Sequence, residues 1–373
     1  MSTQHEVDNP PTELITALSF SSDGTRIAVA SWNRDISIYD NTTNHDTFTF
    51  SGRRIRFRAP VLDICWGEDN DTLYAVGTDF DVRRVKLSEG AGEDQAIQQV
   101  LSTHTKPSNK IAYSSEHGVL ISISWDGTMH VHTVSDGVSI RVRLAAKPFA
   151  ISLSADKAVV AMAERKVSVY DLQALKSLTE QAGTVANGKV PSLHDNVLEV
   201  APWQQRESSL RYMTRDVACM PNGLGFATSS IEGRVAVEWF DPEAQSKTYA
   251  FKCHRQTTTL PADENGEEQQ VDMVYPVNAL AFHPVHGTFA TGGGDGVVYI
   301  WDASTKRRVR HYPNMGASVA AVDFSPDGEF MAVGICPGVE DGKDLNEVVN
   351  HPESIKVIIR KLSPTEAKGK PAK

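Results

Sequence analysis

The chain has 373 residues, of which 40% are hydrophobic and 23% charged, and its formal net charge at pH 7 is −10. This is the composition of a soluble globular protein, and no apolar run approaches the ~20 residues that a membrane-spanning helix needs. The negative charge opposes nonspecific binding to nucleic acid, so we expect no direct DNA partner. Because no apolar run is long enough to span a membrane, we also expect no membrane partner. The N-terminal sequence MSTQHEVDNPPTE lacks the features of a secretory signal, which favours an intracellular protein.

Seven segments share a pattern of alternating β-branched or aromatic residues, which often ends in an acidic or polar residue. In chain order they are 36–40 (ISIYD), 82–87 (VRRVKL), 129–134 (MHVHTV), 167–172 (VSVYDL), 234–240 (RVAVEWF), 297–302 (VVYIWD) and 355–362 (IKVIIRKL). Seven such strands indicate seven repeats.

Further strand signals precede most of these segments. Directly before such a segment lies a strand with small residues, such as 27–32 (IAVASW) or 289–296 (FATGGGDG), and a tight turn connects the two. Further upstream lies another strand that leads into an Asp-Gly turn, as in 16–25 (TALSFSSDGT) and 320–329 (AAVDFSPDGE). Successive repeats lie about 40 to 70 residues apart, close to the period of a WD repeat with loop insertions.

The sequence therefore predicts an all-β, single-domain, seven-bladed WD-repeat β-propeller. We place the blades at about 12–58, 59–103, 107–144, 147–183, 208–256, 274–312 and 316–362. Because a ring must close, we expect a strand near residues 4–7 to complete the last blade and to cover its edge. The basic residues 363–373 are expected to form a disordered tail.

Three segments between the blades have another character. Residues 172–183 (LQALKSLTEQAG) can form a short helical turn on a connector. Residues 184–203 and 257–273 are polar, acidic or contain Gly and Pro, so they are predicted to be long, partly disordered surface loops.

The search for chemistry finds no catalytic or nucleotide-binding motif. The GGGDG sequence lies between two strands, which is typical of a hairpin turn. His283 and His286 lack a third ligand nearby, and the four cysteines have no C-x-x-C spacing, so we expect no metal site. Asp79, Asp126 and Asp295 recur after the second strand of their blades, where a carboxylate can accept turn hydrogen bonds. We therefore predict no catalytic residue and no cofactor.

Two tryptophans are candidates for a binding surface. Trp32 and Trp125 occupy the same position in blades one and three, near the loops at one rim of the ring. Exposed tryptophan is typical of a protein-binding site, whereas the alternative is that each indole fills the space between blades.

Two basic groups are further candidates. Arg234 lies in one predicted strand of blade five, and Lys252, His254 and Arg255 lie in or just after the next strand, so these side chains can form an anion site. The alternative is a solvated basic face. The arginines of GRRIRFRAP (52–60) form a second basic run, at the junction of blades one and two, for which ordinary surface charge is the simpler interpretation.

Five stretches carry a resemblance to a known family. The sequence resembles the Bub family of WD-repeat spindle-checkpoint proteins over nearly the whole chain. The strongest stretches are 205–215 (QRESSLRYMTR), 229–238 (SSIEGRVAVE), 249–255 (YAFKCHR), 275–283 (YPVNALAFH) and 289–302 (FATGGGDGVVYIWD). A messenger-RNA export paralogue that docks on a nucleoporin also carries versions of SIEGRV and FKCHR, whereas the RESSL motif favours the checkpoint member.

The resemblance implies a non-catalytic adaptor of the spindle assembly checkpoint. It implies that Trp32 and Trp125 bind the GLEBS docking motif of a checkpoint kinase and of its pseudokinase relative. It also implies that Arg234 and Lys252 grip a phosphothreonine in Met-Glu-Leu-Thr-type repeats of a kinetochore scaffold, with His254 and Arg255 as additional basic contacts.

The resemblance further implies a monomeric propeller within hetero-complexes, found in the nucleus, at kinetochores in mitosis, and in the cytoplasm. The second blade, the arginine run and the long 337–352 loop depart from the family pattern.

Overall fold

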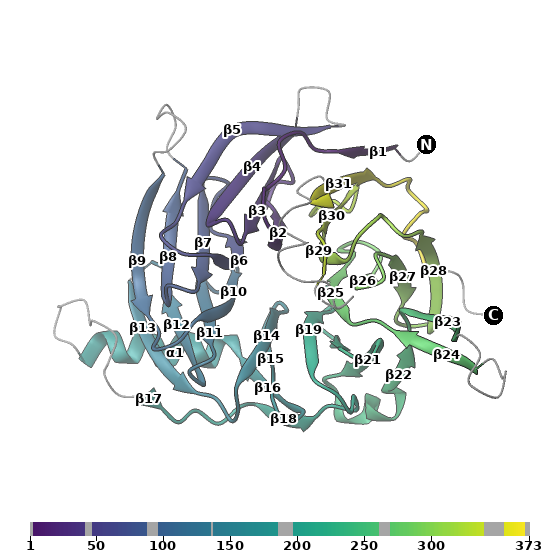
Figure 1. Ribbon diagram of the computed structural model, residues 1–373. Coiled ribbons are helices and arrows are strands. Elements are labelled where there is room, and N and C mark those ends of the chain that lie inside the picture. Colours follow the sequence, from purple (N-terminus) through teal and green to yellow (C-terminus); the bar gives the residue numbers. More distant parts are fainter. Residues whose placement is uncertain are drawn as a thin grey trace.

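The computed structural model describes residues 3–41, 47–87, 96–135, 137–185, 197–260, 269–338 and 354–369. Seven antiparallel sheets are arranged as blades around a central axis (Figure 1). The first strand of each blade lies at the centre of the ring and contacts the first strand of the next blade, which confirms the seven-bladed propeller.

The first three blades are adjacent in the ring and follow the order of the chain. Blade one contains β2 (Ile15–Phe20), β3 (Arg26–Ser31), β4 (Asp35–Asn41) and β5 (Phe48–Arg56). Blade two contains β6 (Val61–Trp66), β7 (Thr72–Gly77), β8 (Asp81–Lys86) and β9 (Ile97–Thr103). Blade three contains β10 (Ser108–Ser114), β11 (Val119–Ser124), β12 (Thr128–Thr133) and β13 (Val138–Arg143), and the short β17 (Val197–Leu198) pairs parallel to β13.

The remaining blades complete the ring. Blade four contains β14 (Pro148–Leu153), β15 (Lys157–Met162), β16 (Lys166–Asp171) and β18 (Gln204–Glu207). Blade five contains β19 (Thr214–Cys219), β20 (Gly225–Ser230), β21 (Arg234–Trp239) and β22 (Tyr249–Lys252), with a 3-10 helix at Pro242–Lys247. Blade six contains β25 (Val277–Phe282), β26 (Thr288–Gly293), β27 (Val298–Asp302) and β28 (Arg307–Tyr312). Blade seven contains β29 (Val319–Phe324), β30 (Phe330–Ile335) and β31 (Lys356–Lys361).

The N-terminus closes the ring. The fourth strand of blade seven is β1 (Thr3–Glu6), which pairs antiparallel with β31, so the strand expected near residues 4–7 occupies this edge. Lys356 and Glu6 form an ion pair of 3.0 Å, and Val7 is buried in the cluster shared by blades seven and one. The first and last parts of the sequence therefore share one sheet.

Packing between blades forms the core. The second strands, such as β7, β11, β15 and β30, are buried along their whole length because a neighbouring blade covers each face. This explains why they consist mainly of apolar and small residues, since neither face of these strands reaches solvent. Four polar side chains on first strands also accept a backbone N–H from the next blade. The pairs are Asp63 with Ile111, Ser152 with Cys219, Asp216 with Leu280, and Asp323 with Phe20, at 2.8–2.9 Å.

Several boundary predictions are wrong. The fourth blade does not end at residue 183, because its outer strand is β18, which follows the helix α1 (Leu172–Val185). This helix has 14 residues and packs against β12 and β13 through Leu172 and Leu175, so it is more than a short turn. Of the predicted 184–203 loop, residues 186–196 lie outside the described residues.

The predicted 257–273 loop is largely a β-hairpin. β23 (Arg255–Leu260) pairs antiparallel with β24 (Gln269–Val274), and the hairpin projects beyond the ring (Figure 1). Its β-branched threonines suit an extended strand better than a loop. Residues 261–268 lie outside the described part of the chain.

Residues 363–369 pack against the propeller, which corrects the prediction of a disordered tail for this part, and residues 370–373 lie outside the described residues. The buried Glu366 carboxylate accepts hydrogen bonds from the Tyr312 hydroxyl (3.0 Å) and Arg360 Nε (2.8 Å). The Ala367 carbonyl accepts from the Thr288 hydroxyl at 2.7 Å. The segment therefore packs across blades six and seven, and Tyr312 and Thr288 are too distant in sequence for its composition to reveal them.

Buried histidines fix two of the turns. In blade six, His254 contacts Asp295 and Thr291, each at 2.8 Å, and Trp301 donates to Thr291. In blade three, His104 contacts Asp126 (3.2 Å) and Ser122 (3.0 Å). Asp295 and Asp126 therefore have the structural role that their positions predict.

Removal of the closing strand provides the first test of this architecture. We expect deletion of residues 1–9 to lower the free energy of unfolding by about 2 kcal/mol or more, because it exposes the β31 edge and the Val7 site. Deletion of residues 370–373 serves as the control. A thermal midpoint that is the same for the two deletions would contradict the role of β1 in closure.

Blade three provides a second test, through pH. Burial lowers the pKa of His132 to about 3, below its value in the unfolded chain, so the unfolded state binds more protons as the pH falls below about 6.5. We expect denaturant titrations to show that the parent loses about 2 kcal/mol more stability between pH 7 and pH 5 than His132→Leu does. Parallel stability curves for the two proteins would show that His132 is not the group responsible.

Candidate functional site

The end of the second strand provides an equivalent position in every blade. At this position each backbone N–H donates to a carbonyl in the segment that precedes the first strand of its blade. The seven residues are Trp32, Thr78, Trp125, Ala163, Ile231, Gly294 and Cys336. Since they form a ring on one face of the propeller, the two tryptophans and Ile231 are the large side chains that this face carries there.

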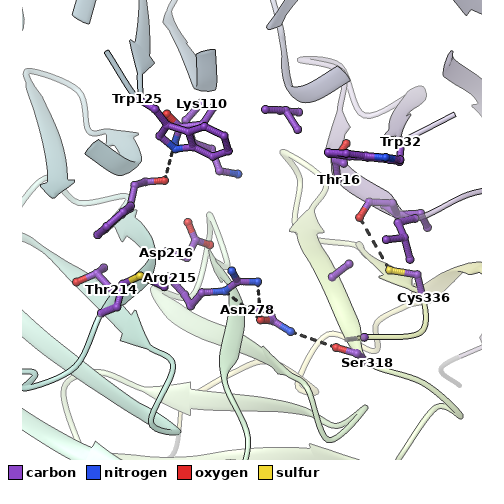
Figure 2. Close-up of a pocket in the computed structure, with 18 of the residues that line it drawn as sticks. Thr16, Trp32, Lys110, Trp125, Thr214, Arg215, Asp216, Asn278, Ser318 and Cys336 are labelled. Atoms are coloured by element: carbon purple, nitrogen blue, oxygen red, sulfur yellow. Dashed lines mark hydrogen bonds between the residues drawn. The ribbon is translucent and has the colours of Figure 1, made fainter. Parts of the chain in front are cut away.

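Trp32 and Trp125 border one pocket. They are 45% and 37% exposed, so neither indole serves only to fill the space between blades. The pocket has a volume of about 570 Å³ and is lined by residues of several first strands, including Thr16, Lys110 and Asp216 (Figure 2). Because the first strands surround the axis, the pocket lies at the centre of this face.

Cations accompany the tryptophans in this pocket. Lys147 Nζ lies 4.8 Å from the centroid of the Trp125 ring, in a cation–π contact. Arg215 donates to Asn278 Oδ1 at 3.0 Å, whereas Lys110 is paired with Asp63 at 3.3 Å. Within the described residues no ion pair joins Lys147 or Arg215 to a carboxylate, so the pocket suits a ligand with apolar and acidic side chains.

Sequence reasoning missed Lys147, Met213 and Arg215 as pocket residues. They lie in or beside the segments that precede the first strands of blades four and five, and Met213 is 45% exposed. Aligning the blades by their first strands would have placed all three on the same face as Trp32. Single-sequence patterns give no such signal for one lysine or one methionine.

A second site lies on blade five. Arg234 begins β21 and is directly opposite Lys252, the last residue of β22. The same positions pair Asp35 with Arg56 in blade one and Lys166 with Glu207 in blade four. Like charges at directly opposite positions destabilise a sheet, and blade five has such a like-charged pair where those blades pair opposite charges.

Arg255 and Glu232 complete this cation site. Arg255 Nη2 donates to the Glu232 carbonyl at 2.9 Å and lies 3.6 Å from its carboxylate. Arg234 Nε lies 3.2 Å from the other oxygen of that carboxylate. In the part of the chain that the structure describes, Lys252 has no ion-pair partner and its side chain is exposed. The site therefore holds three cations and one carboxylate.

The prediction that His254 is an additional basic contact is wrong. His254 is 1% exposed, and both of its ring nitrogens are engaged inside blade six. The residue adopts a positive φ of 50°, which turns its side chain away from the direction of Lys252 and Arg255. Lys252, His254 and Arg255 are nearly contiguous in the sequence YAFKCHR, so the sequence suggests that they lie together. It gives no sign that the side chain of His254 points into blade six.

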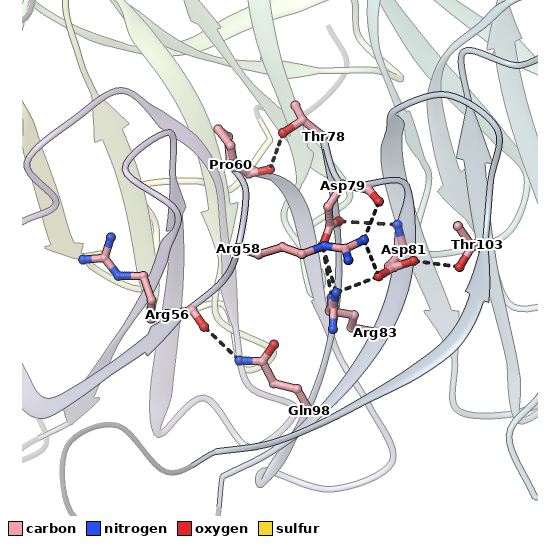
Figure 3. A network of polar contacts seen from close by, with 9 residues as sticks. All are labelled: Arg56, Arg58, Pro60, Thr78, Asp79, Asp81, Arg83, Gln98 and Thr103. Atoms are coloured by element: carbon pink, nitrogen blue, oxygen red, sulfur yellow. Dashed lines mark hydrogen bonds and ion pairs between the residues drawn. The ribbon is translucent and has the colours of Figure 1, made fainter.

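Two of the four arginines in the run at 52–60 are paired with carboxylates. Arg58 bridges Asp79 and Asp81, each at 2.9 Å, and Arg83 contacts the same two carboxylates (Figure 3). Arg56 pairs with Asp35 at 2.7 Å. These contacts give Asp79 the structural role that its position predicts, and they reduce the free positive charge of this edge.

Among the described residues, no group of three or more His, Cys, Asp or Glu side chains could hold a metal ion. The four cysteines are free thiols. The described helices include none that is long and apolar enough to cross a membrane.

The chain contains repeats of the WD family and is similar to several known proteins. The WD domain, G-beta repeat family matches residues 3–40 and 273–302. Mitotic checkpoint protein BUB3.1 of Arabidopsis thaliana is 37% identical over 98% of this chain and 95% of its own length. Mitotic checkpoint protein bub3 of Dictyostelium discoideum is 29% identical, with 91% and 90% covered. The mRNA export factor GLE2 of Chaetomium thermophilum is 28% identical, with 98% and 92% covered.

The seven blades, each with four antiparallel strands and one with a short fifth strand, and the matched repeats define a WD-repeat β-propeller. The similarity to BUB3.1 covers nearly the whole of both chains and therefore identifies one family within this class. The chain belongs to the BUB3 family of WD-repeat proteins.

Proposed function

We propose that this protein is a non-catalytic adaptor of the spindle assembly checkpoint. One surface, the central pocket with Trp32 and Trp125, binds the GLEBS motif of a checkpoint kinase or of its pseudokinase relative. The other surface, the cation site of blade five, binds phosphothreonine in Met-Glu-Leu-Thr-type repeats of a kinetochore scaffold. Binding at both surfaces links the kinase to the kinetochore, which places the protein in the nucleus and at kinetochores in mitosis.

The directly opposed, like-charged pair of Arg234 and Lys252 carries this proposal. A phosphate dianion offers several acceptor oxygens, and two cations on adjacent strands can each form a charge-assisted hydrogen bond with it. The side chains of Arg234 and Lys252 both reach solvent, so packing in the core does not explain why two cations lie opposite each other. A ligand that supplies the missing negative charge accounts for the arrangement.

The central pocket supports the first surface. Exposed tryptophans are effective anchors because each buries a large apolar area with few torsions to immobilise. Lys147 and Arg215 add cations that suit the glutamates of such a docking motif. The two surfaces share a face of the propeller through blade five, because the Ile231 N–H donates to the Met213 carbonyl that borders the pocket.

The relatives support a checkpoint role over the alternative of messenger-RNA export through a nucleoporin. BUB3.1 is 37% identical over nearly the whole chain, whereas the export factor GLE2 is 28% identical over a similar length. A nucleoporin docking motif would use the central pocket and leave the blade-five site unexplained. Phosphate-dependent binding at that site therefore separates the two functions.

The phosphate site is tested by Arg234→Ala. We expect the variant to lose at least ~2 kcal/mol of affinity for a phosphorylated Met-Glu-Leu-Thr peptide in isothermal titration calorimetry, because a charge-assisted contact is removed. Its melting temperature should stay close to that of the parent, since an exposed charge adds little to stability. Equal affinity in the two proteins would eliminate Arg234 from the site.

The docking surface is tested by Trp32→Ala and Trp125→Ala. Each variant should bind a GLEBS peptide more weakly by ~2 kcal/mol or more while keeping its affinity for the phosphopeptide, because the two surfaces are separate. Phe80→Ala, which removes an exposed aromatic residue that does not line the pocket, is the control. Loss of both activities in a tryptophan variant would mean that the indole supports the fold instead.

A further inference from the structure

The turn between the second and third strands carries a short polar residue in four blades. In those blades the side chain accepts the backbone N–H two residues later and so caps its own turn. The capping pairs are Asn33 with Asp35, Asp79 with Asp81, Asp126 with Thr128 and Asp295 with Val297, at 2.9–3.4 Å.

Blades four and five carry glutamate at this position instead. The longer side chain reaches the cation two residues later, so Glu164 pairs with Lys166 at 2.6 Å and Glu232 with Arg234 at 3.2 Å. Glu232 differs from Glu164 in what surrounds it. Lys166 faces Glu207 across the sheet, whereas Arg234 faces Lys252, so Glu232 is the one carboxylate among the three cations of the blade-five site.

The backbone holds Glu232 in place. Its carbonyl accepts from Arg255, and its N–H donates to Ser230 Oγ at 3.3 Å. The next residue, Gly233, has a φ of +60°, and a Cβ there would lie 2.7 Å from the Cys253 carbonyl oxygen. The turn therefore cannot shift easily, but the side chain of Glu232 is 28% accessible and can rotate toward solvent.

We propose that Glu232 is a built-in counter-ion that makes the blade-five site selective for a phosphate dianion over a carboxylate. In the free protein its carboxylate occupies the position between Arg234 and Arg255 that a ligand anion must take. A ligand carboxylate would only replace one monoanion by another. A phosphate brings a second negative charge and further acceptor oxygens, which allow it to displace Glu232 and to engage Lys252 as well.

This inference rests on the proposed function and explains one property of the site. Acidic segments that carry Asp or Glu in place of a phosphorylated threonine should not occupy it. The counter-ion also offsets part of the positive charge of the two arginines while no ligand is bound, which limits nonspecific attraction of other anions. Selectivity of this kind depends on the contact made by Glu232 and not on the total charge of the face.

The test uses the full chain and three Met-Glu-Leu-Thr peptides, with threonine, phosphothreonine or glutamate at the last position. We expect the parent to bind the phosphopeptide and to bind the glutamate peptide only weakly. In Glu232→Gln the affinity for the glutamate peptide should rise about fivefold or more, and the ratio of the two affinities should fall by about threefold, because the competing carboxylate is gone. Isothermal titration calorimetry measures both affinities.

One matched control refines the result. Glu164→Gln removes the equivalent carboxylate of blade four and should leave both affinities unchanged.

The outcomes separate the two proposals. If the parent binds the phosphopeptide selectively and Glu232→Gln keeps the parent ratio, the counter-ion role is wrong and the phosphate site stands. The same conclusion follows if Glu164→Gln changes the ratio as much as Glu232→Gln does, because the effect is then one of total charge. If the parent does not distinguish the phosphopeptide from the threonine peptide, the proposed function fails and the inference with it.

Discussion

Closure of the ring is the constraint on which the rest of the structure depends. Each second strand is buried on both faces only because a neighbouring blade lies on each side, and an open ring would expose two of these apolar faces. The strand β1 completes the sheet of blade seven, and Asp323 accepts the Phe20 N–H from blade one at 2.9 Å. The carboxyl group of Asp323 is buried, and this burial raises its pKa to about 6. Backbone N–H groups donate to this carboxyl group.

Because the blades repeat one geometry, departures from that geometry distinguish the candidate site positions. Residues at the end of the second strand all make the same backbone hydrogen bond, so the tryptophans of blades one and three are not needed to form the turn. The cross-strand pair at the start of the third strand has opposite charges in blades one and four but like charges in blade five. Function is thus superimposed on a scaffold that tolerates many side chains at these positions.

The two surfaces differ in physical character. The central pocket combines exposed aromatic rings with cations, which favours a ligand that buries apolar area and places acidic groups at defined points. The blade-five site is open, polar and small, so we expect its affinity for a phosphate to rest on charge-assisted contacts and on the displacement of Glu232. A ligand on one surface leaves the other accessible, which is what an adaptor between two partners requires.

The sequence by itself determined the number of blades, the all-β class and the closing strand, because these follow from local strand patterns. It also pointed to Trp32, Trp125 and the pair of Arg234 and Lys252 as candidates, but the structure showed that the tryptophans are exposed and that the two cations are directly opposite. The tertiary structure decided the remaining features. His254 turns into blade six, residues 363–369 pack across blades six and seven, and β18 completes blade four after a helix. Each depends on contacts between residues far apart in the chain. Local patterns carry no record of such partners, and neither do they show that Glu232 lies between two arginines.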